Sequence, residues 1–263
     1  MKMSRERSSA IQSVVHALEL MDQFDGELSE LGLTDLSRRL QLPKNKVFRL
    51  LATLEHRNYI EHNISTENYR LGLKTMEIGQ AVIRQRRHLH KVRPLMEALA
   101  RECNETLCLS ILKDYHCVNV HVIEGRNPLR VVQCVGGRVP AYCTSAGKAQ
   151  IAYLPEDKLM RYLAGCRFQR YTPATVIDPQ LLLQQLQQVI WQGYAFELEE
   201  LEVGVMSIAA PVRDYTLKTI SAITCYFPSM RFNDERLKEK LLPLVLKGAT
   251  EISALLGCSR SRS

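Results

Sequence analysis

The sequence predicts an α+β protein in which a small winged helix-turn-helix unit precedes a larger domain of mixed strands and helices. Two observations predict this class. Near the N-terminus, three stretches with helical apolar spacing are followed by two short β-type stretches around a polar turn. Beyond residue 105, strand-like and helix-like stretches mix without the regular βαβ alternation of a parallel sheet. We therefore expect domain boundaries at 8–71, 72–88 and 89–258, with a linker helix in the middle.

The N-terminal unit is expected to hold three helices and a hairpin. In chain order we expect a helix at 10–24, a polar loop at 25–32, a short helix that begins near Thr34, a helix from Pro43 or Lys44 to about His56, and a hairpin at 58–71. Thr34 is a residue type that caps helix N-termini, and Pro43 ends the second helix because the residue before a proline avoids helical geometry. Two short helices joined by a tight turn and followed by a hairpin have the order of a winged helix-turn-helix.

From Gly72 onward the chain is expected to begin with helices and to continue with strands and helices together. We expect helices at 72–87 and 92–100, then at 144–154, 155–163, 179–192 and 234–256, and strands at 106–112, 118–123, 129–132, 205–212 and 219–227. The last two strands are expected to be buried. We find no internal repeat.

The composition is that of an ordinary globular protein. The chain has 263 residues, of which 46% are hydrophobic and 24% are charged, so there is ample apolar material for a core. No apolar run approaches the roughly 18 residues that a membrane span needs. The polar segment Met1–Ser9 is not followed by the apolar stretch of a secretory signal. We therefore expect a cytoplasmic protein with no membrane partner.

The eight cysteines are expected to be free thiols. None of them forms a C-x-x-C pair, which is the usual spacing of zinc and iron–sulfur sites. His116, Cys117 and His121 are candidates for a metal site, but on a strand Cys117 and His121 would face one side while His116 faces the other. We expect no metal site and no cofactor.

The third helix is expected to bind double-stranded operator DNA. In a helix-turn-helix the second helix of the motif enters the major groove, with its N-terminal residues at the base edges. The net charge of the chain is +7, and 38–57 holds six basic residues and one acid, which suits a polyanionic partner. The residues expected to contact DNA are Lys44, Asn45, Lys46, Phe48 and Arg49, with Arg70 touching the adjacent backbone. The alternative is a basic helical hairpin that is only solvated.

Several segments along nearly the whole chain resemble those of IclR-type transcription regulators. These segments are Leu33-Thr34-Asp35-Leu36-Ser37, 42–51, Tyr69-Arg70-Leu71-Gly72, 140–149, Gly193-Tyr194, Glu199-Glu200 and 204–212. The resemblance implies a winged helix domain, a linker helix, a GAF-like α+β effector domain, and assembly into a homodimer or a dimer of dimers. It implies a DNA-binding regulator and not an enzyme.

The third helix departs from the usual sequence of that family. The usual sequence of the family in this segment is close to L-P-K-S-T-V-H-R-L-L, and Asn45, Lys46 and Phe48 differ from it. We expect this departure to set the operator preference of the protein rather than to abolish DNA binding.

The resemblance also implies which residues line an effector pocket. They are Val131, Ser145, Ala146, Glu197, Ser207, Thr224 and Tyr226. Thr144 or Ser145 can cap the helix that follows Cys143, and a helix N-terminus attracts anions. We therefore expect a small organic acid, either an aliphatic or an aromatic carboxylic acid, as the effector. Glu197 would repel a second negative charge or accept a hydrogen bond from a ligand hydroxyl. The alternative is a collapsed pocket that contributes only to packing.

Two alternative functions rest on a few residues each. Cys143 lies close to a helix N-terminus, which lowers the pKa of a thiol, so DNA binding could respond to oxidation of this cysteine. Ser145 and Lys148 form the S-x-x-K pair of serine acylases, but the partner motifs S-D-N and K-T-G are absent. We therefore expect no catalytic residues.

Overall fold

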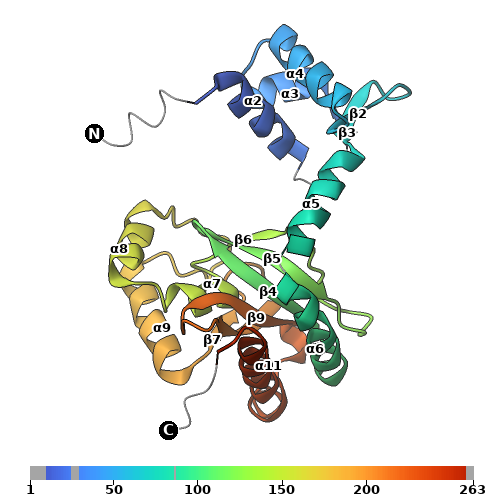
Figure 1. The fold of residues 1–263 in the computed structure, drawn as a ribbon. Coiled ribbons are helices and arrows are strands. Elements are labelled where there is room, and N and C mark those ends of the chain that lie inside the picture. Colours follow the sequence, from blue (N-terminus) through green and yellow to red (C-terminus); the bar gives the residue numbers. More distant parts are fainter. Residues whose placement is uncertain (1–9, 25–29, 86, 259–263) are drawn as a thin grey trace. The chain divides into compact units, whose positions relative to one another are not determined.

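The computed structural model describes residues 10–24, 30–85 and 87–258, without the side chains of 82–90. Most of the loop expected at 25–32, the polar start of the chain and its Ser/Arg end lie outside these residues. The chain divides into two compact units, Met1–Gln85 and Arg86–Ser263 (Figure 1). Among the described helices, none combines the length and the apolar content that crossing a membrane requires.

The N-terminal unit contains the expected helix-turn-helix and hairpin. Its elements are α2 (Gln12–Met21), η1 (Asp22–Phe24), β1 (Leu31–Gly32), α3 (Leu33–Leu40), α4 (Lys44–His56), β2 (Ile60–Asn63), β3 (Asn68–Leu71) and α5 (Leu73–Gln85). The three strands form a sheet with β3 in the centre. Each element before α5 contributes to a small core, which consists of Leu20, Phe24, Leu31, Leu36, Val47, Leu51, Ile60 and Tyr69.

Two local expectations for this unit are wrong. Thr34 does not cap the second helix, because α3 begins one residue earlier, directly after Gly32 and without a side-chain cap. Leu31 and Gly32 do not lie in a loop, because they pair with β3 and add a third strand to the hairpin. This pairing joins residues far apart in the sequence, so no local pattern indicates where α3 starts.

The C-terminal unit is built on one antiparallel sheet of six strands. Its helices are α6 (Arg87–Cys103), α7 (Ser145–Ile151), α8 (Glu156–Gly165), α9 (Pro179–Gln192), η2 (Ser229–Arg231), α10 (Asp234–Arg236), the π-helical turn η3 (Leu237–Leu241) and α11 (Leu242–Leu255). Its strands are β4 (Thr106–Lys113), β5 (His116–Ile123), β6 (Arg138–Pro140), β7 (Ala195–Leu198), β8 (Val205–Arg213) and β9 (Thr219–Pro228). The strand order is β6-β5-β4-β9-β8-β7.

Helices cover both faces of this sheet (Figure 1). Helices α6 and α11 pack together on one face, which we call the apolar face. Its buried strand residues are Leu107, Leu109, Ile208, Ala210, Val212, Ile223, Cys225 and Phe227. Helices α7 and α9 pack on the opposite face over Cys117, Ala195, Ala209 and Ala222. The small side chains on that face let α7 approach the sheet closely.

Three expectations for the strands are wrong. Residues 129–132 form no strand, and Val131 lies in a loop instead. The backbone carbonyl of Val131 accepts a hydrogen bond from the Thr106 hydroxyl at 2.6 Å. Two strands were not expected, β6 and β7, which form the two edges of the sheet. Each of them is only three or four residues long, so their extended conformation depends on the neighbouring strand more than on their own sequence.

Strand β5 contains a β-bulge that changes which way its side chains face. Asn119 pairs with Ser110, but His121 pairs with Leu109, the residue before Ser110. An extra residue in one strand moves the following side chains to the other face. Cys117 therefore shares a face with Ser110 and His121 does not, so the expectation that Cys117 and His121 face together is wrong. The described part of the chain holds no cluster of three side chains able to bind a metal ion.

Candidate functional site

The outer side of α4 is the first candidate site. Val47 and Leu51 are fully buried in the core of the N-terminal unit, and they fix which side of the helix faces outward. On the outer side, Lys44, Asn45, Phe48 and Arg49 are exposed, while Lys46 is half-buried. Phe48 leaves 53% of its surface exposed, which is unusual for an aromatic side chain in a helix of a small domain. The structure therefore presents the expected residues together at the start of one helix.

The basic side chains of this surface differ in how they are paired. Within the described residues, Lys44, Lys46 and Arg49 form no ion pair, so their charges are available to phosphates. Arg70 is engaged, because its guanidinium donates to the Glu61 carboxylate at 3.0 Å and lies 4.0 Å from Glu30. Arg70 can contact DNA only by exchanging these carboxylates for a phosphate.

Gly72 holds the hairpin against the start of α5. Its N–H donates to the Tyr59 carbonyl at 2.8 Å, and the Lys74 N–H donates to the Asn58 carbonyl at 3.3 Å. A Cβ at position 72 would lie 2.3 Å from the Asn58 carbonyl oxygen. This contact distance explains physically why a glycine follows Tyr69-Arg70-Leu71.

The second candidate site lies on the face of the six-stranded sheet that α7 covers. Residues directly opposite each other in an antiparallel pair project from the same face. By this rule the register aligns Glu197 with Ser207, Ser207 with Tyr226, and Tyr226 with Thr106. Thr224, two residues before Tyr226 on the same strand, projects from the same face and lies opposite Cys108 and Ala209. We call this surface the polar face.

Several buried polar atoms on the polar face lack a hydrogen-bond partner within the described residues. They are the hydroxyls of Ser110, Thr224 and Tyr226 and the amide oxygen of Asn119. All four side chains are at most 2% exposed. Burial raises the pKa of Tyr226 well above its usual range, so its hydroxyl stays protonated. Unpaired buried polar groups are costly and uncommon, and here they gather on one surface.

Ser145 connects α7 to this surface. Its hydroxyl lies 2.6 Å from the Ser207 hydroxyl, and the Ser207 hydroxyl donates to the Glu197 carboxylate at 2.8 Å. Thr144 caps the helix, because its hydroxyl accepts the Gly147 N–H at 3.3 Å. At Gly147 a Cβ would meet the Ala141 carbonyl oxygen at 1.9 Å, so only glycine permits this close packing of α7.

Glu197 is almost completely buried on β7. Burial raises the pKa of its carboxyl to about 7, against the opposing effect of the hydrogen bonds from Ser207 and from the Glu200 backbone. The Glu200 N–H donates to the carboxylate at 2.6 Å. Near neutral pH this carboxyl is therefore divided between its charged and neutral forms, and the neutral form can donate a hydrogen bond.

Lys148 and Glu200 form a buried ion pair beside this surface. Lys148 is 1% exposed, and its ammonium group donates to the Glu200 carboxylate. Lys148 is thus engaged with Glu200, whereas Ser145 is engaged with Ser207. The geometry does not pair Ser145 with Lys148 as acylase chemistry would need.

The redox hypothesis for Cys143 started from a wrong expectation. Cys143 is fully buried, and burial raises the pKa of its thiol to about 12 instead of lowering it. The nearby carboxylate of Glu200 adds to this effect. A thiol that stays protonated and inaccessible is a poor target for oxidants, so the proximity of a helix N-terminus is outweighed by desolvation.

Two of the expected residues lie beside this surface: Val131 packs with Cys108 and Tyr226 at the edge of the polar face, and Ala146 is buried in α7. The structure also adds two residues that were not expected. Ser110 and Asn119 were missed, although both stand as polar residues inside otherwise apolar strands. Because alternate strand residues share a face, the pattern Thr106, Cys108, Ser110 was the available signal.

Comparisons with known proteins agree along the whole chain. Residues 13–63 match the model of the IclR helix-turn-helix domain, and residues 80–254 match that of the bacterial transcriptional regulator IclR C-terminal domain. The chain is 32% identical over 252 residues to the HTH-type transcriptional regulator KdgR of Escherichia coli K12, covering 96% of this chain and 95% of the relative. It is 34% identical over 227 residues to XynR of the same organism, covering 86% and 90%.

Among solved structures, one similar fold is that of an IclR homologue from Microbacterium hydrocarbonoxydans in complex with 4-hydroxybenzoate. The TM-score is 0.80 at 21% identity, with 94% of this chain and 100% of the other covered. At this identity the similarity concerns the fold. The curated relatives named above are transcriptional regulators.

Proposed function

The chain belongs to the IclR family of transcriptional regulators, and from this premise we propose that its operator binding is controlled by a small carboxylic acid bound on the polar face. The family combines a DNA-binding helix-turn-helix with a C-terminal ligand-binding domain. The observation that carries the proposal is the set of unpaired buried hydroxyls of Ser110, Thr224 and Tyr226. Each hydroxyl can donate one hydrogen bond, and a carboxylate can accept several.

The bound acid of a structural relative supports the same class of ligand. The Microbacterium homologue was solved with 4-hydroxybenzoate, which is an aromatic acid with a phenolic hydroxyl. On this chain, Val131, Ala146 and Tyr226 supply apolar atoms for contact with a ring. The hydroxyls of Ser145 and Ser207 are already hydrogen-bonded to each other, and each can still accept a hydrogen bond from a phenolic hydroxyl. Aromatic carboxylic acids are therefore the first compounds to test.

A carboxylate ligand can lie beside Glu197 only when the Glu197 carboxyl is neutral. A charged Glu197 would repel the ligand, and Lys148 cannot offset that repulsion because it is engaged with Glu200. Burial raises the pKa of Glu197 to about 7, so the carboxyl can become neutral as the ligand binds. A neutral Glu197 donates a hydrogen bond instead of repelling the ligand.

We assign the reading of operator sequence to α4. Lys44, Lys46 and Arg49 provide charge for phosphates or guanine edges, and Asn45 can pair with adenine. Phe48 is exposed and apolar, and the apolar group available in the major groove is the methyl group of thymine. Arg70 would steady the hairpin on the adjacent backbone.

Assembly into a homodimer or a dimer of dimers completes the proposal. Helix-turn-helix proteins bind paired half-sites about one helical turn apart, and this requires two copies. Ile11, Val14 and Leu18 at and along α2 are 69%, 51% and 57% exposed, which leaves an apolar stripe for a second copy. Because its DNA partner lies in the bacterial cytoplasm, we place the protein there.

A thermal-shift series with footprinting tests the effector. We expect the Tm to rise with increasing concentration of 4-hydroxybenzoate or a related acid, and 4-hydroxybenzamide, its neutral counterpart, to have a much smaller effect. The same acid should change the footprint on DNA upstream of the gene. A neutral or cationic metabolite that raises the Tm where all acids fail would contradict the carboxylate proposal.

A charge-matched pair of variants tests the DNA surface. Lys46→Ala/Arg49→Ala should lose on the order of 1–3 kcal/mol of operator binding if either side chain contacts a base. Lys158→Ala/Arg161→Ala removes two exposed charges from α8 and should leave operator affinity nearly unchanged. Equal affinities for both double variants would remove α4 as the reader.

A further inference from the structure

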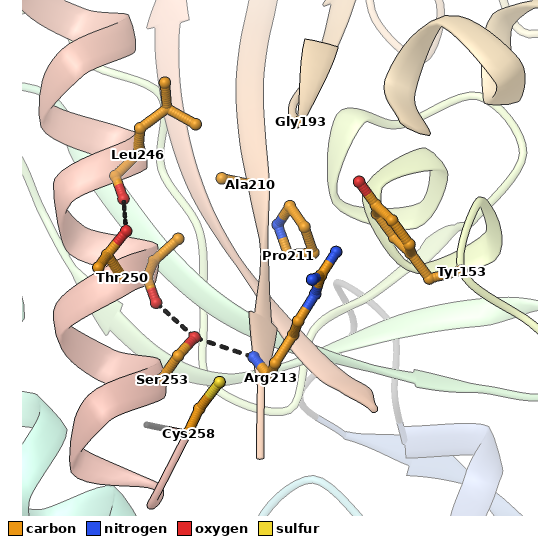
Figure 2. A pocket seen from close by; sticks show the side chains of 10 residues that line it. Tyr153, Gly193, Ala210, Pro211, Arg213, Leu246, Thr250, Ser253 and Cys258 are labelled. Atoms are coloured by element: carbon orange, nitrogen blue, oxygen red, sulfur yellow. Dashed lines mark hydrogen bonds between the residues drawn. The ribbon is translucent and has the colours of Figure 1, made fainter. Parts of the chain in front are cut away.

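A pocket of about 240 Å³ lies along the end of strand β8 in the C-terminal unit (Figure 2). It lies between the end of β8 and α11, and Tyr153 and Gly193 close its other side. Its lining residues include none of those named for the proposed effector site. The pocket is therefore a site separate from the proposed effector site.

The pocket exists because β8 extends beyond its neighbour β7. Strand β7 pairs with β8 no farther than Ala209, so in the described residues 210–213 have no strand on that side. Pro211 has no N–H, and the N–H of Arg213 donates to the Ser253 hydroxyl of α11 at 2.9 Å. This edge thus offers little to an added strand, and side chains decide what the pocket can bind.

Arg213 brings a positive charge to the pocket. Its guanidinium lies over the Tyr153 ring, 4.8 Å from the ring centroid, and Figure 2 shows it between Pro211 and Tyr153. Within the described residues this guanidinium takes part in no ion pair and no hydrogen bond. Arg231 and Arg236 of the same unit behave differently, because both pair with the buried Glu105 carboxylate, at 2.6 Å and 2.7 Å.

This arrangement leaves the edge of the guanidinium free. Stacking on an aromatic ring occupies one face of the planar group, whereas its N–H donors point outward from the rim. Two parallel N–H groups match the two oxygens of a carboxylate. The remaining wall is apolar, with Ala210, Pro211 and Leu246 facing the space.

We propose that this pocket is a second anion site, which binds a short aliphatic carboxylate with its oxygens on Arg213 and its chain against Pro211 and Leu246. The volume is below the roughly 300–1,000 Å³ of pockets for drug-sized ligands, so the ligand is small. The apolar wall favours a carboxylate with a hydrocarbon chain over inorganic phosphate. The proposal does not depend on the nature of the effector.

Isothermal titration of the full-length protein at constant ionic strength tests the site. Butyrate is the probe, butyramide is its neutral counterpart, and inorganic phosphate is the alternative anion. We expect saturable binding of butyrate, with butyramide and phosphate each at least tenfold weaker. Arg213→Gln should weaken butyrate binding at least tenfold, whereas Arg161→Gln, which removes an exposed charge from α8, should leave it unchanged.

Four results would overturn the proposal. They are no saturable binding of butyrate, equal binding of butyramide, tighter binding of phosphate, and wild-type affinity in Arg213→Gln. Loss of butyrate binding in Thr224→Val but not in Arg213→Gln would assign the ligand to the polar face instead. Should Arg213→Gln not fold, Arg213→Lys keeps the charge but lacks the planar fork, and we expect butyrate binding to fall several-fold. Unchanged affinity in Arg213→Lys would also contradict the proposed geometry.

Discussion

The two faces of the six-stranded sheet are formed by the same strands, yet they differ in the side chains that they bury. On the apolar face, Leu109, Ile223 and their neighbours form a cluster of hydrophobic side chains that packs against α6 and α11. On the polar face, one residue away along each strand, Ser110 and Thr224 are buried with unpaired hydroxyls. The apolar face carries the packing that stabilises the domain, and the polar face accepts an energetic penalty that folding alone does not require.

The alternation of strand residues thus separates hydrophobic packing on one face from unpaired polar atoms on the other. A surface kept polar at a cost to stability is a candidate for ligand binding, because a ligand can satisfy the atoms that the protein leaves unpaired. Four predictions test the separation, in order of decreasing expected effect.

The largest effect on stability is expected at the buried ion pair between Lys148 and Glu200, beside the polar face. Lys148→Met should destabilise the protein by about 3–5 kcal/mol, because it leaves the Glu200 carboxylate buried without its partner. Urea unfolding followed by circular dichroism measures this loss. The double variant Lys148→Met/Glu200→Leu should recover most of it, and an equal loss in the double variant would mean that the ion pair is not the cause.

The apolar face should be the more sensitive one to loss of volume. Leu109→Ala removes a side chain that is 1% exposed between the sheet and its helices, and it should cost about 2–5 kcal/mol of unfolding free energy. The urea concentration at the midpoint of unfolding should fall, while the dependence of the unfolding free energy on urea concentration stays unchanged. A cost below 1 kcal/mol would show that this face is loosely packed.

Glu197 should make stability depend on pH in one direction. Burial raises the pKa of its carboxyl from 4.5 to about 7, so between these values the folded state binds more protons than the unfolded state. Stability from this group is full below pH 4.5, falls as the pH rises to about 7, and is level above that. The total change is up to about 3 kcal/mol. The difference between wild type and Glu197→Gln across this range isolates it, and a difference that is constant with pH would contradict it.

The smallest effect on stability is expected on the polar face itself. Thr224→Val replaces an unpaired buried hydroxyl with a methyl group of similar shape, so stability should change by less than about 1 kcal/mol and should not fall. Effector affinity, measured by titration with the acid found in the thermal-shift series, should fall at least tenfold. A large loss of stability would show that the hydroxyl has a structural partner.

Local signals predicted the elements that depend on few residues. Helix α9 was predicted with the bounds that the structure gives it. Asp178 caps its start, Pro179 occupies its first turn, and Gly193 ends it in the left-handed conformation, so both ends depend on residues close in the sequence. Strands β6 and β7 and the bulge in β5 were missed because they depend on pairing across the sheet. A one-residue insertion in a strand changes no composition or spacing that a local pattern can detect.

The candidate site shows the same limit. Glu197, Thr224 and Tyr226 came from the family resemblance, and the register of β7, β8 and β9 places them on one face. The pairing of Lys148 with Glu200 joins residues 52 positions apart and could not be predicted from either residue alone. Burial, which decides the pKa of Cys143, is likewise a property of the whole fold.

The contact at Gly72 has a mechanical consequence. Within the N-terminal unit, the backbone hydrogen bonds at Gly72 and Lys74 tie the first turn of α5 to Asn58 and Tyr59, which connect α4 to the hairpin. These hydrogen bonds couple the start of α5 to the segment that directly follows α4. If α4 reads the operator as proposed, a twist applied to the start of α5 would be transmitted through these hydrogen bonds and would change how Phe48 and Arg49 face the base pairs.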